Sequence, residues 1–428
     1  MKNYLKITIN NKVFSNSIWM ILEKIISVFG LLFVTSYVAK YIGPSNFGIL
    51  TYVASIFIIA QALSTFGSEH VLFKRIAKNR KSGINLMMST SYLRHLVFIS
   101  LSIGILCYLW VSSDQLTFTF GVATAVAYYF SAIDVFSVYN NAVLNSKLNT
   151  YCNITGLLIS LIVRYIIAHY ELDIRYLCIP IILVTCIPFA MKVYLYHSKK
   201  FNFQPRIDKK RYGKYLIKTG TPLAFSTVSA IIYTRVTLFF IMAYCGPSEL
   251  GIFSVASQLA TSWMFITSAF ITSYFTKIYT EKDESIALIQ AAKLNGSVLF
   301  CAIIVILILV LIGKKLILTL YGVAYLQAYD VMLILCINTL FSCMGPVASK
   351  FIIFKSGFSF LSLKMMLTML LSIPSAYFLT KEYGIYGAAI STIITEFLSL
   401  TLMNYLFRNG IIFKLHYKMF FINTYARN

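Results

Sequence analysis

Twelve long apolar runs follow one another along the chain, and this pattern restricts the fold more than any other feature. About 20 helical residues cross a bilayer, and the runs lack the period-two alternation that membrane strands require. We therefore expect an all-α polytopic membrane protein with about 12 transmembrane helices. The predicted helices cover residues 15–40, 48–67, 84–111, 116–138, 153–169, 176–196, 218–244, 252–276, 294–313, 327–349, 359–380 and 385–407.

Composition and charge agree with a membrane protein. Of the 428 residues, 59% are hydrophobic and 12% are charged, whereas soluble domains carry about 25% charge. The net charge of +23 does not indicate a nucleic-acid partner, because most Lys and Arg lie in alternate loops. This layout satisfies the positive-inside rule with both termini in the cytoplasm. The outside loops would then hold only Lys40, Arg175, Lys314, Lys315 and Lys381.

One short motif occurs twice, each time between two apolar runs. Tyr41-Ile-Gly-Pro-Ser-Asn-Phe-Gly-Ile49 returns as Tyr244-Cys-Gly-Pro-Ser-Glu-Leu-Gly-Ile252, with Tyr, Pro, Ser, Ile and both Gly unchanged. Gly-Pro ends one helix, and the second Gly lets the next helix begin close by. Two such outside turns indicate two homologous halves, related as parallel repeats. The turn residues are Gly43, Pro44, Gly48, Gly246, Pro247 and Gly251.

The repeat and the charge layout predict four segments. Residues 1–196 form an N-terminal six-helix bundle, and residues 197–217 form a basic cytoplasmic linker. Residues 218–407 form a C-terminal six-helix bundle, and residues 408–428 form a cytoplasmic amphipathic tail. We expect no cleavable signal peptide, because residues 1–14 are polar and basic.

Ionisable residues inside the predicted helices are the best candidates for function, because an uncompensated charge in a membrane costs several kcal/mol. Three basic residues are candidate contacts for an anionic pyrophosphate or sugar in a water-filled cavity: Arg235, Arg164 and Lys24. A structural ion pair is the alternative for Arg235, and Arg164 could instead reach the outer interface. Arg94 and Lys364 lie near inner helix ends, where we expect their side chains to snorkel to the interface.

Three acidic residues share the same membrane segments: Asp134, Glu396 and Glu23. Each could titrate as a site for a coupling ion, H⁺ or Na⁺, or form a structural ion pair with a basic residue. We interpret the abundant Tyr and Phe as side chains that face the lipid or lie in belts at the membrane interfaces. Stacking on sugar rings is the alternative.

Enzyme motifs are missing from the sequence. It contains no P-loop, HExxH or GxSxG pattern, and the eight cysteines form no CxxC pair. We therefore expect a transporter with no cofactor and no metal site. The longest outside loop, residues 314–326, leaves little room for an extracytoplasmic catalytic domain.

Four stretches resemble the bacterial polysaccharide (O-antigen) flippases, within the multidrug/oligosaccharidyl-lipid/polysaccharide exporter superfamily. They begin at Asn16 in the first helix, at Val38 before the first Gly-Pro turn, at Tyr321 in Tyr-Gly-Val-Ala-Tyr, and at Tyr383 in Tyr-Gly-Ile-Tyr-Gly-Ala-Ala-Ile. Glu396 follows the last stretch, and Lys40 stands where the family more often has Arg. The resemblance implies two six-helix bundles in a V around a cationic cavity, with alternating access coupled to an ion gradient.

The resemblance implies a flippase that moves undecaprenyl-pyrophosphate-linked oligosaccharide repeat units, of O-antigen or capsule type, across the bacterial inner membrane. Its partners would be this lipid-linked oligosaccharide, H⁺ or Na⁺, membrane lipids, and the polymerase and chain-length regulator of the same pathway. A drug or metabolite antiporter of the same superfamily is one alternative. An integral-membrane polysaccharide polymerase is the second.

Overall fold

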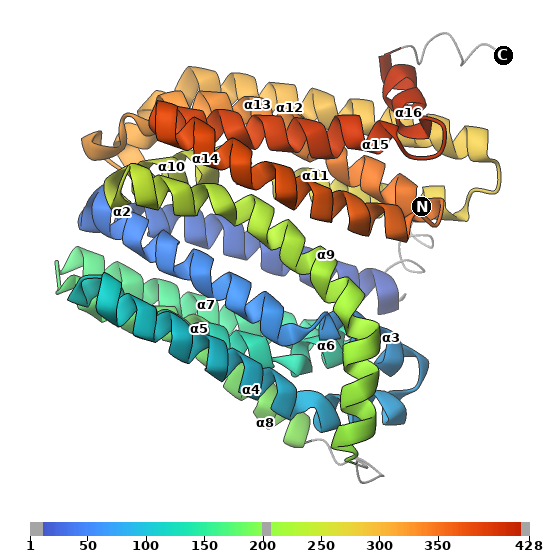
Figure 1. The fold of residues 1–428 in the computed structure, drawn as a ribbon, viewed down its shortest axis with the longest axis horizontal. Coiled ribbons are helices and arrows are strands. Elements are labelled where there is room, and N and C mark those ends of the chain that lie inside the picture. The colour runs from blue at the N-terminus through green and yellow to red at the C-terminus, as the bar shows by residue number, and fades with distance from the viewer. Residues whose placement is uncertain (1–11, 199–206, 421–428) are drawn as a thin grey trace, which may run out of the picture. The chain divides into compact units, whose positions relative to one another are not determined.

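The computed structural model describes residues 12–198 and 207–420, and every regular element in these two ranges is a helix (Figure 1). The first half contains α2 (Lys12–Thr65), α3 (Ser68–Lys78), α4 (Arg80–Ser112), α5 (Gln115–Ile133), α6 (Val135–Ala142), α7 (Ser146–His169), η1 (Ile174–Leu177) and α8 (Cys178–His197). The second half contains α9 (Lys209–Tyr244), α10 (Pro247–Thr261), α11 (Met264–Thr280), α12 (Glu284–Leu320), η2 (Val323–Tyr325), α13 (Ala328–Phe354), α14 (Phe358–Phe397), η3 (Leu398–Leu402), α15 (Met403–Tyr405) and α16 (Ile411–Phe420).

Two of the helical segments are long enough to cross a membrane twice. Ten segments of the described chain are apolar and long enough to span a bilayer, and two of these are 48 residues long. Forty-eight residues of helix measure about 72 Å, more than twice the bilayer core. Each long segment contains a glycine with non-helical backbone angles, Gly43 in α2 and Gly384 in α14. Twelve membrane passes result, which confirms the predicted fold class.

The loop before α13, predicted to lie outside, is shorter than expected. Lys314 and Lys315 lie within α12, which continues to Leu320, so the expectation of a loop over residues 314–326 is wrong. The apolar residues after the two lysines extend the helix, and Gly322 then turns the chain with φ 88° and ψ 177°. The short η2 helix follows this turn directly.

The chain divides into two compact units. Unit 1 contains Met1–Ile42 and Ile49–Ile231, and unit 2 contains Gly43–Gly48 and Ile232–Asn428. The chain passes between the units at three points, two in α2 and one in α9, and all three lie inside helices. The basic linker expected over residues 197–217 lies partly outside the described residues, and α9 already begins at Lys209. The domain boundaries at residues 196 and 218 stay a prediction.

In unit 1, α5 packs on α4 and α8, α7 packs on α8, and α3 packs on α4 and α6. The core at the α3–α6 end has side chains with no exposed area, among them Leu72, Met87 and Tyr139. The chain breaks at Asp134 between α5 and α6. Its side chain accepts a hydrogen bond from the Ser137 amide, so the same residue starts α6.

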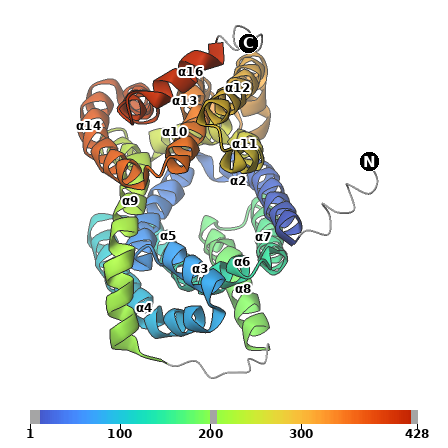
Figure 2. The same ribbon diagram turned by 90° about the vertical axis from the view of Figure 1, so that its right-hand side faces the viewer.

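In unit 2, α13 is the central helix and contacts α10, α11, α12 and α14 (Figure 2). The terminal helix α16 packs across α12 (Figure 1). Its buried residues Ile412, Leu415, His416 and Met419 lie on one face at helical spacing, so α16 is amphipathic. Residues 421–428 of the predicted tail lie outside the described chain.

Candidate functional site

The repeated motif forms the same backbone turn in both halves. Gly43 has φ 75° and ψ 169°, and Gly246 has φ 88° and ψ 177°. These angles belong to a region that is essentially restricted to glycine. Pro44 and Pro247 follow immediately, and Pro247 is the first residue of α10, where a missing amide proton costs nothing. The two turns therefore match in conformation as well as in sequence.

The three basic candidates have no acidic partner. Arg164 in α7 and Lys24 in α2 belong to unit 1, and Arg235 in α9 belongs to unit 2. Both arginines are partly buried, whereas the Lys24 side chain is exposed. Within residues 12–198 and 207–420, none of the three makes a hydrogen bond or an ion pair.

Asp134 lies in an ion pair that anchors three helices of unit 1. Its Oδ2 atom lies 2.7 Å from Lys192 Nζ and accepts a hydrogen bond of 2.6 Å from Ser137 Oγ. Lys192 also donates to Ser137 Oγ at 2.7 Å, and only 3% of its side chain is exposed. Asp134 Oδ1 accepts from the Ser137 amide at 3.1 Å. Both oxygens of Asp134 are thus occupied, and α5, α6 and α8 are joined.

Lys192 is not among the site residues predicted from the sequence. It lies near the C-terminal end of an apolar run, where a lysine has the pattern of an ordinary flanking residue. The spacing of Asp134 and Lys192 along the chain carries no signal that they meet. Only the packing of α5 against α8 brings them together.

Glu23 contacts an uncharged partner. Its Oε1 atom accepts a hydrogen bond of 2.6 Å from Asn153 Nδ2, which joins α2 to α7. A second bond between the same helices runs from Thr150 Oγ1 to the carbonyl oxygen of Trp19, at 3.0 Å. Glu23 therefore takes part in helix packing through a neutral amide.

Glu396 differs from both other acidic residues. Its Oε2 atom is buried and has no hydrogen-bond partner in the described part of the chain. It interacts electrostatically with Lys364 and with Tyr233. Lys364 is itself 2% exposed and donates from Nζ to Asn404 Oδ1 at 3.0 Å. These four residues form a polar cluster inside unit 2.

Arg94 and Lys364 do not snorkel, so that expectation is wrong. Arg94 is 1% exposed and donates to Met87 O at 3.3 Å and to Thr90 Oγ1 at 3.4 Å. Both hydrogen bonds run back to the preceding turns of α4, so the guanidinium group stays inside unit 1. The Lys364 side chain is held inside unit 2 by Asn404.

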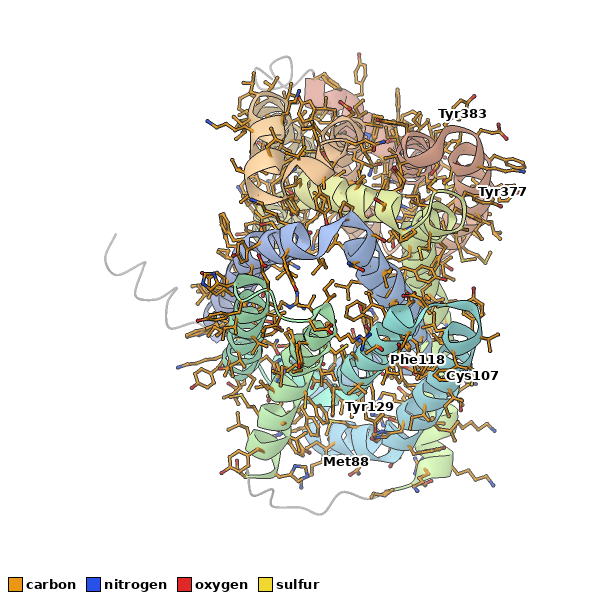
Figure 3. The ribbon with its side chains drawn as sticks, turned by 90° about the vertical axis from the view of Figure 1, so that its left-hand side faces the viewer. Met88, Cys107, Phe118, Tyr129, Tyr377 and Tyr383 are labelled. Atoms are coloured by element: carbon orange, nitrogen blue, oxygen red, sulfur yellow. The ribbon has the colours of Figure 1, made fainter. Side chains whose placement is uncertain are left out.

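An aromatic cluster joins α9 and α14 in unit 2. Tyr377 of α14, labelled in Figure 3, packs edge-on against Phe240 and Tyr244 of α9, with ring centroids 5.7 and 5.8 Å apart. Tyr383, also labelled, is 65% exposed and immediately precedes Gly384, where α14 bends. Such rings suit a membrane interface, and they also offer faces for stacking on a sugar.

These features define a multi-pass helical membrane protein with polar clusters in each unit and with three basic candidates that have no acidic partner among the described residues. The profile of a family described as polysaccharide biosynthesis protein matches residues 13–276, and the chain belongs to this family. The sequence is also similar to the capsular polysaccharide biosynthesis protein CapF of Staphylococcus aureus, with 25% identity over 264 residues. That similarity covers 59% of this chain and 64% of CapF, so the chain matches less than two thirds of its relative.

Solved transporter structures share the fold. The lipid II flippase MurJ in an inward closed conformation superposes with a TM-score of 0.69 at 15% identity, covering 95% of this chain and 90% of MurJ. An inward-facing multidrug resistance transporter of the MATE family, in the MOP superfamily, gives a TM-score of 0.64 at 12% identity. It covers 92% of this chain and 98% of that protein. At these identities the likeness concerns the fold.

Proposed function

We propose that this protein is a flippase for undecaprenyl-pyrophosphate-linked oligosaccharide repeat units of the O-antigen or capsule type. Membership of the polysaccharide biosynthesis family over residues 13–276 is the observation that carries the proposal. The similarity to a capsular polysaccharide biosynthesis protein and a fold shared with a lipid II flippase support it. The protein would act in the bacterial inner membrane, with both termini in the cytoplasm.

Arg235, Arg164 and Lys24 are the residues that we assign to substrate binding. A guanidinium group can donate two parallel hydrogen bonds to a phosphate, so each arginine suits the anionic pyrophosphate. In the described chain none of the three is neutralised by a carboxylate, which leaves their charge for a ligand. The exposed Lys24 ammonium adds a point charge for phosphate or sugar hydroxyls.

Transport would proceed by alternating access and would be coupled to an ion gradient. Of the three acidic candidates, Glu396 is the one whose carboxyl group lacks a hydrogen-bonding or ion-pairing partner in the described chain. Asp134 is occupied by Lys192 and Ser137, and Glu23 by Asn153. We therefore assign coupling to Glu396 and helix packing to the other two.

The decisive experiment measures the leaflet in which lipid-linked repeat units accumulate in a deletion strain that carries plasmid-borne variants. Arg235→Ala should leave single units on the cytoplasmic side and abolish surface glycan, while the protein stays in the membrane. Arg175→Ala is the matched control, because Arg175 is an exposed arginine in η1. Normal glycan export by the Arg235→Ala variant would contradict the proposal.

Two other outcomes point to the alternatives. Units that reach the outer leaflet but remain unpolymerised would indicate an integral-membrane polysaccharide polymerase. Unaffected glycan lipids with increased drug sensitivity would indicate a small-molecule antiporter. A structural neighbour of the same fold is named as a multidrug resistance transporter.

A further inference from the structure

Glu396 carries a carboxyl oxygen that is buried without a donor. The residue lies next to the end of α14, and its Oε2 atom accepts no hydrogen bond from the described residues. Burying a charged carboxylate without a hydrogen-bond donor costs a large desolvation free energy, whereas burying a neutral carboxylic acid costs much less. The arrangement therefore accommodates the protonated form of Glu396.

The buried cation that interacts electrostatically with Glu396 is held by a different residue. Lys364 Nζ donates to Asn404 Oδ1 at 3.0 Å and is within electrostatic range of Glu396. The two residues nevertheless do not form an ion pair in the described chain. An ammonium group placed on a neutral amide, with a carboxylate within reach, is in its less favourable position. This placement makes sense if Glu396 is uncharged in this conformation.

A change of helix type separates the two groups that can accept from Lys364. The π-helical turn η3 (Leu398–Leu402) lies between Glu396 and Asn404. Such turns are rare and often occur at functional sites, because the extra residue can shift along the helix. The hydroxyl group of Ser399 in this turn is buried and has no partner among the described residues. The turn can thus change the relative positions of Glu396 and Asn404.

The titratable groups that face Glu396 are Lys364 of α14 and Tyr233 of α9. Neither can replace a hydration shell of oxygen ligands around Na⁺. The Lys364 ammonium, which interacts electrostatically with Glu396, would repel a second cation bound there. The cluster therefore suits a proton better than a metal ion.

We propose that Glu396 is a proton-binding switch that controls Lys364. With the proton bound, Lys364 rests on Asn404, as observed. When the proton leaves to water, the Glu396 carboxylate draws the Lys364 ammonium away from Asn404, and η3 adjusts. The pair is then neutral overall, so no charge stays uncompensated in the membrane. The role of this switch in coupling rests on the proposed transport function, and it names H⁺ as the coupling ion.

Infrared difference spectroscopy of the full-length protein in lipid nanodiscs tests the switch. We expect a band of a protonated buried carboxyl group that disappears when the pH of the sample is raised stepwise. Glu396→Gln should remove the band. Glu382→Gln, which changes an exposed carboxylate near the bend of the same helix, should leave it unchanged. Lys364→Met should make the band persist to a pH about one unit higher, because the stabilising cation is gone.

A second variant covers the case in which Glu396→Gln does not fold. Asn404→Leu removes the acceptor that competes for Lys364, so the band should disappear at a lower pH than in the wild type. The proposal is overturned if the band depends on Na⁺ in place of choline, which indicates a sodium site. It is also overturned if no band depends on Glu396, which indicates a permanently charged structural group.

Glycan export separates this inference from the proposed function. A titrating Glu396 together with normal export by the Glu396→Gln strain would remove the coupling role and leave the proton site intact. Loss of export without any titration would support the flippase and reject the switch.

Discussion

Gly48 approaches the carbonyl oxygen of Pro247 so closely that a Cβ atom on residue 48 would lie 1.8 Å from that oxygen. The reverse contact has the same form, because a Cβ atom on Gly251 would lie 2.0 Å from the carbonyl oxygen of Pro44. The two repeated turns thus touch reciprocally, as expected for segments related by a pseudo-two-fold axis. All four residues belong to unit 2. The second glycine of each motif allows contact between the two turns.

Alanine at Gly48 or Gly251 should destabilise the protein strongly. The obstructing atoms belong to the backbone, which cannot rotate away as a side chain can, so we expect a loss of about 1–3 kcal/mol or more. Gly104→Ala in α4 is the control, because a Cβ atom there meets nothing within 4 Å and alanine favours a helix. The melting temperature of purified protein should fall for Gly48→Ala and stay level or rise for Gly104→Ala. Equal effects would contradict the reciprocal contact.

Alanine at Gly246 should destabilise the protein through the backbone alone. A Cβ atom there meets nothing within 4 Å, but φ 88° and ψ 177° are strained for any other residue, at a cost of about 1–3 kcal/mol. Asparagine tolerates left-handed helical angles but not this value of ψ. Gly246→Asn should therefore be no more stable than Gly246→Ala in the same melting assay. Full stability of either variant would show that the turn relaxes.

Lys192→Met should cost up to about 3 kcal/mol, because it leaves the partly buried Asp134 carboxylate without its cation. Asp134→Asn retains a cap for α6 while it removes the charge. The double variant Asp134→Asn, Lys192→Met should recover much of the stability that Lys192→Met loses. A double-mutant cycle on chemical or thermal unfolding measures this coupling. A coupling energy near zero would mean that the observed 2.7 Å pair contributes little.

Acid should weaken the docking of α16 through His416. This residue is 6% exposed, and burial lowers its pKa from 6.5 to about 4. In the unfolded chain the imidazole takes up a proton near pH 6.5, whereas the folded protein resists protonation until about pH 4. Stability is therefore fully present above pH 6.5 and falls as the pH drops toward 4, by up to about 3 kcal/mol.

The matching measurement compares melting temperatures at neutral and acidic pH for the wild type and His416→Phe. Phenylalanine keeps an aromatic ring against Tyr405, whose ring centroid lies 5.5 Å from that of His416, but it cannot titrate. The variant should lose part of the pH dependence. An unchanged pH profile would show that His416 does not link protonation to folding.

Much of the fold could be predicted from the apolar runs and the turn glycines. The expected break between residues 380 and 385 occurs at Gly384, inside what is otherwise one helix. The ends of the helices were predicted less well where polar residues border an apolar run. Lys314 and Lys315 look like the start of a loop, yet they continue α12, because a lysine on a helix can extend toward the interface without ending it.

The candidate site was less predictable, because a charged side chain near a helix end can either extend to the membrane interface or be buried against another helix. Arg94 and Lys364 seemed free to reach the interface, and the structure buries both. Lys192 looked like a flanking residue, and it neutralises Asp134. These choices depend on which helix covers which face, and the spacing of residues along a single helix does not carry that information.

The sequence by itself predicted twelve membrane-spanning helices, because the bilayer thickness fixes how many apolar residues one crossing needs, and the ten apolar segments of the described chain, two of them long enough to cross twice, agree with it. It also determined the paired Gly-Pro turns, because only glycine adopts their backbone angles. Only the tertiary structure decided that Asp134 meets Lys192, that Glu23 meets Asn153 and that Glu396 has a buried oxygen without a donor. Pairing of charges inside a membrane protein depends on contacts between helices that are distant in sequence.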